Sequence, residues 1–307
     1  MTEETGLLCM SYGTARGPDD LVPYLTHIRR GRPPSPELVE EMRARYAAIG
    51  GHSPLIEITE RQVGGLEREL NAAGRRFRAY HGMKHQAPYI EDAVERIAAD
   101  GIVRTVGVVL APHYSRLSVG EYIERAEKAA ADTGMETTFV ESFHAHPAFV
   151  AFVKDRVHRA LDSLREGLRA DATVVFSAHS LPARILEMGD PYAKQLEETA
   201  QAVAEGEPYS YRTAWQSAGR TGEPWLGPDL SDAIRELAAD GVDAVVSCPV
   251  GFVSDHLEVL YDIDVEAQNV AEEVGVTLVR TESPNDDPAF LRALADVVRD
   301  HLQKEGW

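Results

Sequence analysis

The chain has 307 residues, of which 44% are hydrophobic and 26% charged, and its formal net charge is −19. This composition is typical of an acidic globular protein and disfavours non-specific binding to nucleic acid. Acidic residues at the start, where a secretory signal needs positive charge, and a following apolar run too short to span a bilayer predict a cytoplasmic protein with no integral membrane segment.

Strand-like apolar runs alternate with helix-like segments through the first half of the chain. The expected strands cover residues 6–10, 76–81, 104–111 and 136–141. The first and third of these runs lead directly into polar residues. The expected helices cover residues 35–46, 58–73, 89–100, 119–133 and 148–164.

The second half repeats this alternation. Its expected strands cover residues 173–178, 209–214, 244–248 and 276–280, and its expected helices cover residues 190–204, 231–240, 254–273 and 288–303. Parallel strands need long crossover connections, so the pattern predicts an α/β fold of two Rossmann-like, doubly wound domains with a cleft between them. We assign residues 1–145 to the first domain and 146–307 to the second, whose last helix, about 288–307, could pack back on the first.

The signatures of nucleotide sites are missing from the sequence. Residues 12–17 lack the Gly-x-Gly-x-x-Gly spacing that lets a pyrophosphate approach the backbone. The sequence also lacks a Gly-x-x-x-x-Gly-Lys-Ser/Thr loop and a Gly-x-Ser-x-Gly elbow. Cys9 and Cys248 lie in separate apolar runs, which predicts buried, reduced thiols.

The apolar run at residues 174–178 ends abruptly at His179. Such a run is typical of a strand that is buried on both faces, and open α/β sheets place their chemistry just beyond the strand ends. A histidine at that edge can exchange protons near neutral pH. The alternative is that His179 only caps a turn before Pro182.

A row of carboxylates follows the strand expected at 244–248. Glu258, Asp262 and Glu266 are four residues apart and share one face of an α-helix, whereas Asp264 points elsewhere unless the helix is locally widened. One interpretation is an N-terminal cap, with Asp255 and Glu258, followed by a solvated acidic face. The other is a divalent-metal site, since like charges at this spacing repel unless a cation binds them.

Other histidines and arginines are weaker signals. His81 and His85 have a spacing that could suit a metal, but an intervening glycine favours a turn, and His144 and His146 are interpreted as linker residues. The arginines at 29–32 could bind phosphate or carboxylate groups through paired hydrogen bonds, or form a solvated basic loop.

Eight motifs, in this order, resemble those of the ferrochelatase family; they lie at residues 11–14, 26–32, 45–46, 50–55, 177–182, 215–217, 225–228 and 255–262. They are spread over almost the whole chain. Several of them are long and all occur in the same order, which argues against a chance match. The resemblance implies two Rossmann-like domains that flank a porphyrin cleft, and an enzyme, a lyase, that inserts ferrous iron into a porphyrin.

Within this family the chain is most similar to the bacterial coproporphyrin III ferrochelatases. Their branch uses a tyrosine at the position of Tyr12 as axial ligand of the product iron, whereas protoporphyrin enzymes usually have methionine there. The implied reaction inserts Fe²⁺ into coproporphyrin III with release of two protons, and yields coproheme for heme biosynthesis. Some members of the family bind an iron–sulfur cluster through cysteines, several of them in a C-terminal extension; because residues 301–307 contain no cysteine, we expect no cluster. We also expect no permanently bound cofactor.

The resemblance also implies roles for ten residues. His179 and Glu258 are the catalytic pair and flank the iron on one porphyrin face, with Tyr12 on the other. Asp262 and Glu266 either guide hydrated cations inward or hold a second metal such as Mg²⁺. Contacts to the propionates are implied for Arg29, Arg45, Tyr46, Ser53 and Tyr122.

Two other functions stay open. A carrier could bind heme, porphyrin or metal through Tyr12 or the acidic row without catalysis, and a cobalt or nickel chelatase for another tetrapyrrole would share the fold. The pairing of His179 with Glu258 favours an enzyme, since a carrier needs no base. We expect a monomer that binds coproporphyrin III and Fe²⁺ and contacts a downstream coproheme-using enzyme transiently.

Overall fold

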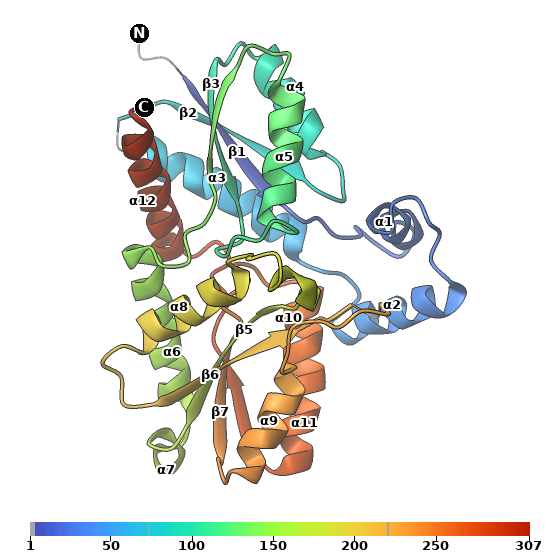
Figure 1. The fold of residues 1–307 in the computed structure, drawn as a ribbon, viewed down its shortest axis with the longest axis vertical. Helices are drawn as coiled ribbons and strands as arrows, with labels where there is room; N and C mark the ends of the chain where they lie inside the picture. Colours follow the sequence, from blue (N-terminus) through green and yellow to red (C-terminus); the bar gives the residue numbers. More distant parts are fainter. Residues whose placement is uncertain (1–3, 73, 220) are drawn as a thin grey trace.

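The computed structural model describes residues 4–72, 74–219 and 221–307 and contains two four-stranded parallel sheets (Figure 1). The acidic start at residues 1–3, and position 73 at the expected end of a helix, lie outside the described residues. The predicted fold class is confirmed, because each half of the chain forms one parallel sheet with helices on both faces.

The first sheet has the strand order β2-β1-β3-β4. Its strands are β1 (Thr5–Ser11), β2 (Phe77–Met83), β3 (Arg104–Val109) and β4 (Glu136–Val140). Alternate residues of β1 face opposite sides, so Leu7 packs towards α3 (Leu55–Ala72) and α12 (Pro288–Glu305), and Leu8 towards α4 (Ile90–Ala99) and α5 (Val119–Ala130). Both faces of the strand are therefore buried.

The second sheet repeats this arrangement with the order β6-β5-β7-β8. Its strands are β5 (Thr173–His179), β6 (Ser210–Gln216), β7 (Ala244–Cys248) and β8 (Thr277–Arg280). Val174 and Phe176 of β5 face α6 (Pro147–Ser163) and α8 (Tyr192–Ala204), while Val175 faces α9 (Leu230–Ala239) and α11 (Gln268–Val274). The short elements α7 (Glu166–Arg169) and a 3₁₀ turn (Ala183–Ile185) complete this half.

Matching strands of the two sheets end at the same place. In the order 2-1-3-4 the strand order reverses beside the first strand. Ligands of open α/β sheets bind at such a switch point. Figure 1 shows that β1 and β5 both point their carboxyl ends towards the middle of the molecule. Tyr12, which follows β1, and His179, which ends β5, therefore occupy equivalent positions in the two domains.

Two helical segments differ from the sequence-based prediction. No helix was predicted at residues 21–28, but α1 (Leu21–Ile28) occupies that segment and forms, with α2 (Pro36–Ala48), an arm on the side of the molecule (Figure 1). The single helix expected at 254–273 consists of α10 (Leu257–Tyr261), a π-helix (Asp262–Ala267) and α11. The wider turn changes which residues share a face.

Polar contacts hold the two halves together around the middle of the molecule. Gln62 of α3 donates to the carbonyl oxygens of Val253 and Asn285, at 2.8 Å each. On another side, the Ser115 hydroxyl donates to Asp190 at 3.0 Å. Helix α12 packs against α3 as well as α6, so the last helix contacts a helix that covers the first sheet. The domain boundary near residue 145 stays a prediction.

The two cysteines are buried free thiols, as expected, and burial raises the pKa of Cys9 and Cys248 to about 12. No helix in the described part of the chain is long and apolar enough to cross a membrane.

Candidate functional site

His179 and Glu258 meet at the carboxyl edge of the second sheet. His179 is the last residue of β5, and Glu258 lies in the first turn of α10, which follows β7. The Nε2 atom of His179 is 3.6 Å from Oε1 of Glu258, and both side chains are about one-third exposed. The structure brings the predicted pair together, although their positions differ by 79 residues along the chain.

Hydrogen bonds set the orientation of His179. Its Nδ1–H donates to the carbonyl oxygen of Ser180, and the Tyr192 hydroxyl donates to the carbonyl oxygen of His179 at 3.0 Å. Because Nδ1 is engaged, Nε2 is the atom that is directed at Glu258 and that can take a proton or a metal. His256 lies on the other side of Glu258, with its Nε2 atom 3.6 Å from Oε2.

Charge pairing dominates the ionisation of this pair. Burial disfavours the charged imidazolium, but the Glu258 carboxylate and the Ser180 carbonyl outweigh it and raise the pKa of His179 to about 9. Burial also favours the neutral form of Glu258, but His179 and His256 hold the pKa of that carboxyl well below its usual range. At neutral pH His179 and Glu258 therefore form an imidazolium–carboxylate pair.

Tyr12 faces this pair from the first domain. It directly follows β1, and 42% of its surface is exposed. Partial burial and the carboxylates of Glu258 and Glu121 raise the pKa of Tyr12 well above its usual range, so its phenol is neutral. Tyr12 and the His179–Glu258 pair thus lie at the carboxyl edges of the two sheets, and the region where these edges meet is called the opening below.

The acidic row divides into separate contacts. Asp262, 8% exposed, accepts a hydrogen bond from Ser217, a residue held at a positive φ of 59° at the end of β6. Burial, opposed by Ser217 and reinforced by Glu258, raises the pKa of Asp262 to about 7. Asp264 points away and forms a paired contact with Arg280 at 2.7 and 2.9 Å.

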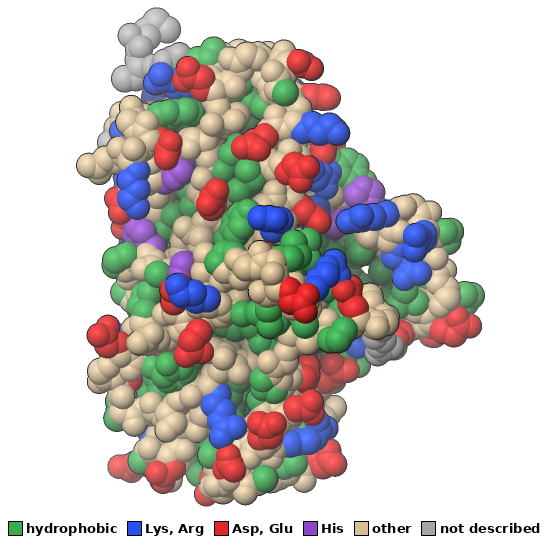
Figure 2. Space-filling model, in the orientation of Figure 1, with side chains coloured by type: hydrophobic (Ala, Val, Ile, Leu, Met, Phe, Trp, Pro, Cys, Tyr) green, Lys and Arg blue, Asp and Glu red, His purple; other side chains and the backbone are tan. Residues whose placement is uncertain are grey.

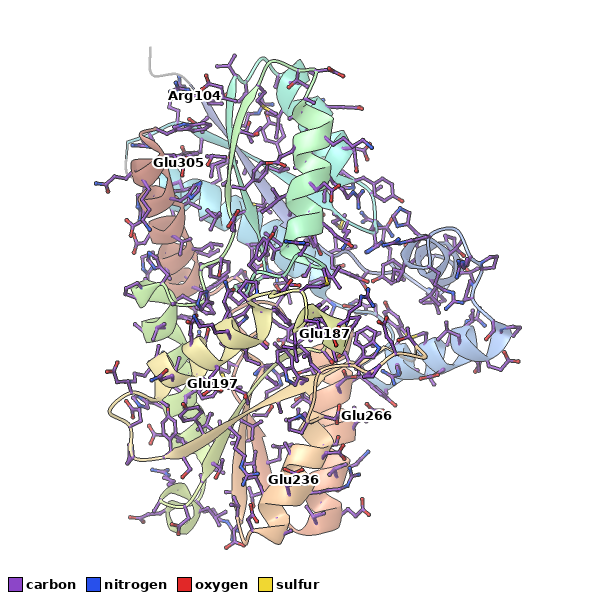
Figure 3. The ribbon with its side chains drawn as sticks, in the orientation of Figure 1. Arg104, Glu187, Glu197, Glu236, Glu266 and Glu305 are labelled. Atoms are coloured by element: carbon purple, nitrogen blue, oxygen red, sulfur yellow. The ribbon has the colours of Figure 1, made fainter. Side chains whose placement is uncertain are left out.

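The cation that balances this row is an arginine from the arm. Nη1 of Arg45 is 3.5 Å from Asp262, and its Nη2 atom is 3.8 Å from Glu266 and 3.3 Å from Glu41. Its guanidinium also lies over the Tyr261 ring, 4.8 Å from the centroid. Arg45, for which a propionate contact was expected, thus pairs with Asp262 and Glu266; Figure 3 shows Glu266 below α2.

The N-terminal cap interpretation was wrong. Asp255 does not cap α10; its carboxylate accepts hydrogen bonds from Ser283, Asn285 and Arg280. These contacts fasten the start of α10 to the segment after β8.

The other expected contact residues lie on the first domain and its arm. The Tyr46 hydroxyl is 2.8 Å from that of Thr14, and Tyr122 is buried under the Lys84 ammonium group. Ser53 is 4% exposed, and its hydroxyl has no hydrogen-bond partner among the residues that the structure describes. Arg29 is exposed at the end of α1.

Several neighbours of the site carried no clear signal in the sequence. His85 packs its ring on Tyr12, with centroids 4.6 Å apart, and His27 reaches His85 from the arm. His81 instead lies in β2, where Ser11 contacts its Nε2 atom at 2.7 Å. The histidines expected to be linker residues pair across the fold, His144 with Glu198 and His146 with Asp300.

Basic side chains on the arm and between the two sheets could bind an anion although the protein is acidic overall. Figure 2 shows Lys and Arg side chains on the arm and along the band where the two domains meet. A pocket of about 240 Å³ opens beside them; its lining includes Ala15, Leu21, Arg43 and Tyr46. Within the described residues, no three or more His, Cys, Asp or Glu side chains form a ready metal cage.

Comparison with known proteins identifies the family. The family model described as Ferrochelatase matches residues 4–302. The chain belongs to the ferrochelatase family. Two relatives are named coproporphyrin III ferrochelatase: that of Anoxybacillus flavithermus is 50% identical over 306 residues, covering 98% of this chain and 97% of the relative, and that of Bacillus subtilis is 48% identical over 301 residues, covering 96% and 97%.

Solved structures of chelatases share the fold of this ferrochelatase-family chain. SirB from Bacillus subtilis with Fe³⁺ aligns with a TM-score of 0.60 at 15% identity, over 99% of this chain and 98% of SirB. CbiX, described as the terminal enzyme of siroheme biosynthesis in denitrifying bacteria, aligns with a TM-score of 0.54 at 12% identity, over 96% and 98%. At these identities the likeness supports the two-domain architecture alone.

Proposed function

We propose that this protein inserts Fe²⁺ into coproporphyrin III, giving coproheme and two protons, as a step of heme biosynthesis. The observation that carries the proposal is the His179–Glu258 pair at the end of β5, which faces Tyr12 across the opening between the domains. Relatives of nearly the same length, at 48–50% identity, are named for this reaction.

Metal insertion removes two protons from the pyrrole nitrogens, so the site needs a group that can take protons and let them go. His179 holds a proton at neutral pH, and one Nε2 lone pair serves either that proton or a metal, so an Fe²⁺ that binds there would displace the proton to solvent. Once the ion has passed to the macrocycle, the Nε2 lone pair is free again and can accept a pyrrole proton. Glu258 stabilises the imidazolium each time it forms.

Propionates of the substrate bind at the first domain and its arm in this proposal. Arg29 is exposed and can form charge-assisted pairs, while Ser53 offers a buried hydroxyl without a partner in the described chain. Tyr46 and Tyr122 line the same side. Arg45 would exchange its contact with Asp262 or Glu266 for a propionate, which frees the acidic row to guide hydrated cations or hold Mg²⁺.

The remaining properties follow from the same proposal. The protein acts in the cytoplasm as a monomer without an iron–sulfur cluster or a permanent cofactor, and it passes coproheme to a second enzyme through transient contact. Residues 1–145 and 146–307 form its two domains, with the last helix packed on the first, as the contact between α12 and α3 supports.

His179→Ala tests the proposal. We expect the variant to bind coproporphyrin III with wild-type affinity, measured by fluorescence quenching, and to lose at least about a hundredfold in the rate of iron insertion under anaerobic conditions. His158→Ala, which removes an exposed histidine of α6, is the matched control and should keep the wild-type rate.

Retained turnover in His179→Ala would exclude His179 as the essential group. Tight binding of coproheme by the wild-type protein, with no rate enhancement over the uncatalysed reaction, would instead identify a carrier.

A further inference from the structure

His27 and His85 form a pair of histidines on the Tyr12 side of the opening. His27 comes from α1 and His85 follows β2, and their Nδ1 atoms are 3.0 Å apart. The His27 ring is stacked on Tyr89 with centroids 5.1 Å apart, and the His85 ring packs on Tyr12 at 4.6 Å. The pair is therefore held in place by aromatic neighbours on both sides.

The spacing of the two nitrogens matches the bite of a divalent metal ion. With each nitrogen about 2.1 Å from the ion, as for zinc and imidazole, a separation of 3.0 Å corresponds to an N–metal–N angle of about 90°. That is the angle between adjacent ligands in six-coordinate geometry. Imidazole nitrogen is a good ligand for iron, cobalt, nickel and zinc in their divalent states.

We propose that His27 and His85 bind a divalent cation of the iron and cobalt type through their Nδ1 atoms, with water in the other positions, and so form a metal-acquisition site on the Tyr12 side of the opening. With only two protein ligands the site binds weakly and releases its ion. That suits a substrate rather than a structural metal.

The access route agrees with this assignment. His27 is exposed on the arm, His85 is half-buried behind it, and Tyr12 lies against His85. The three residues thus contact one another in the order His27, His85, Tyr12. The backbone N–H of His85 donates to the Tyr12 carbonyl at 2.9 Å, which fixes the distance between the pair and the tyrosine.

The two cations nearest the pair each have a carboxylate partner. Lys84 is paired with Glu121, and Arg125 forms a bidentate pair with Glu91 at 2.7 Å, so two cations stand beside two carboxylates.

In this structure the Nδ1–H of one of the two histidines donates a hydrogen bond to Nδ1 of the other. Metal binding requires that proton to move to Nε2 of the same ring, by exchange with solvent, so the site takes up the ion without net proton release. This distinguishes it from His179, where the ion displaces a proton.

Calorimetric titration of the porphyrin-free protein with Co²⁺ at pH 7.5 tests the site. The background is His179→Ala, which removes the imidazole at the end of β5. We expect this protein to bind one Co²⁺ and the additional His85→Phe change to weaken binding at least about tenfold. Phenylalanine keeps a ring against Tyr12, so packing is retained.

Two further variants complete the design. His27→Phe, at an exposed position, should weaken Co²⁺ binding as His85→Phe does, while His158→Ala should leave it unchanged. Thermal unfolding of each variant checks the fold. Equal Co²⁺ affinity with and without the His27–His85 pair, or no Co²⁺ binding in the His179→Ala background, would overturn the proposal.

The role in iron acquisition rests on the proposed function, whereas Co²⁺ binding does not. In the insertion assay we expect His27→Phe to raise the KM for Fe²⁺ several-fold and to leave the KM for coproporphyrin III unchanged. An unchanged KM for Fe²⁺ would overturn the acquisition role. If the wild-type protein inserts no iron, the proposed function fails, and the calorimetric result still decides the metal site.

Discussion

The ionisation of His179 controls how the free site responds to pH. Its pKa is about 9 in the folded protein and 6.5 in its ordinary state, so the imidazolium contributes stability that is fully present below about pH 6.5 and lost as pH rises through 9. We expect the free energy of unfolding of wild type to exceed that of His179→Gln most at pH 6, and the difference to shrink by pH 10.

Urea denaturation of both proteins at pH 6, 8 and 10 measures this difference, with His158→Gln as the control for an exposed histidine. A difference that stays constant from pH 6 to pH 10 would contradict the assigned ion pair.

At the residue scale, the sequence predicted which residues belong to the site better than it predicted which residues they contact. His179 was identifiable because an apolar run stops at it, and Glu258 because it belongs to an acidic row. The partner of Arg45 was not identifiable, since its contact with Asp262 joins α2 to the π-helix across more than 200 residues. The pairing of His85 with His27 depends on α1, a helix that was not predicted from the sequence.

At the scale of elements, the π-helix changes the helical turn within the acidic row. Glu258 lies in α10, Asp262 begins the π-helix and accepts a hydrogen bond from Ser217, and Asp262 and Glu266 both contact Arg45. Regular four-residue spacing predicted the shared face of Glu258 and Asp262 but not the change of turn between them. Tertiary contacts, such as that of Asp262 with Ser217, favour the wider turn, and they are not visible in local sequence.

Two adjacent glycines of α3 provide a test of its contact with α12. A Cβ at Gly65 would lie 2.3 Å from Cδ1 of Leu291, whereas one at Gly64 would approach only Arg68, at 3.4 Å. We expect Gly65→Ala to lower the free energy of unfolding by about 1–2 kcal/mol through overpacking. Gly64→Ala should raise it by up to about 1 kcal/mol, because alanine is the better helix former.

Denaturant unfolding compares the two variants with wild type. Equal effects of the two substitutions would contradict the close packing of α12 on the first domain.

At the scale of the whole molecule, alternating strand and helix signals were sufficient to predict two parallel sheets. They were not sufficient to predict that both have the order 2-1-3-4, because strand order depends on crossovers that leave no local trace. That shared order brings the ends of β1 and β5 together and sets Tyr12 opposite His179. The site is thus a consequence of the paired topology.

The choice of porphyrin tests the central claim most directly. Initial rates of Fe²⁺ insertion are measured anaerobically with coproporphyrin III and with protoporphyrin IX at equal concentrations. Tyr12 opposite the His179–Glu258 pair, and basic side chains on the arm and where the domains meet, predict a clear preference for the tetracarboxylate coproporphyrin III. A preference for protoporphyrin IX, or no insertion into either porphyrin, would contradict it.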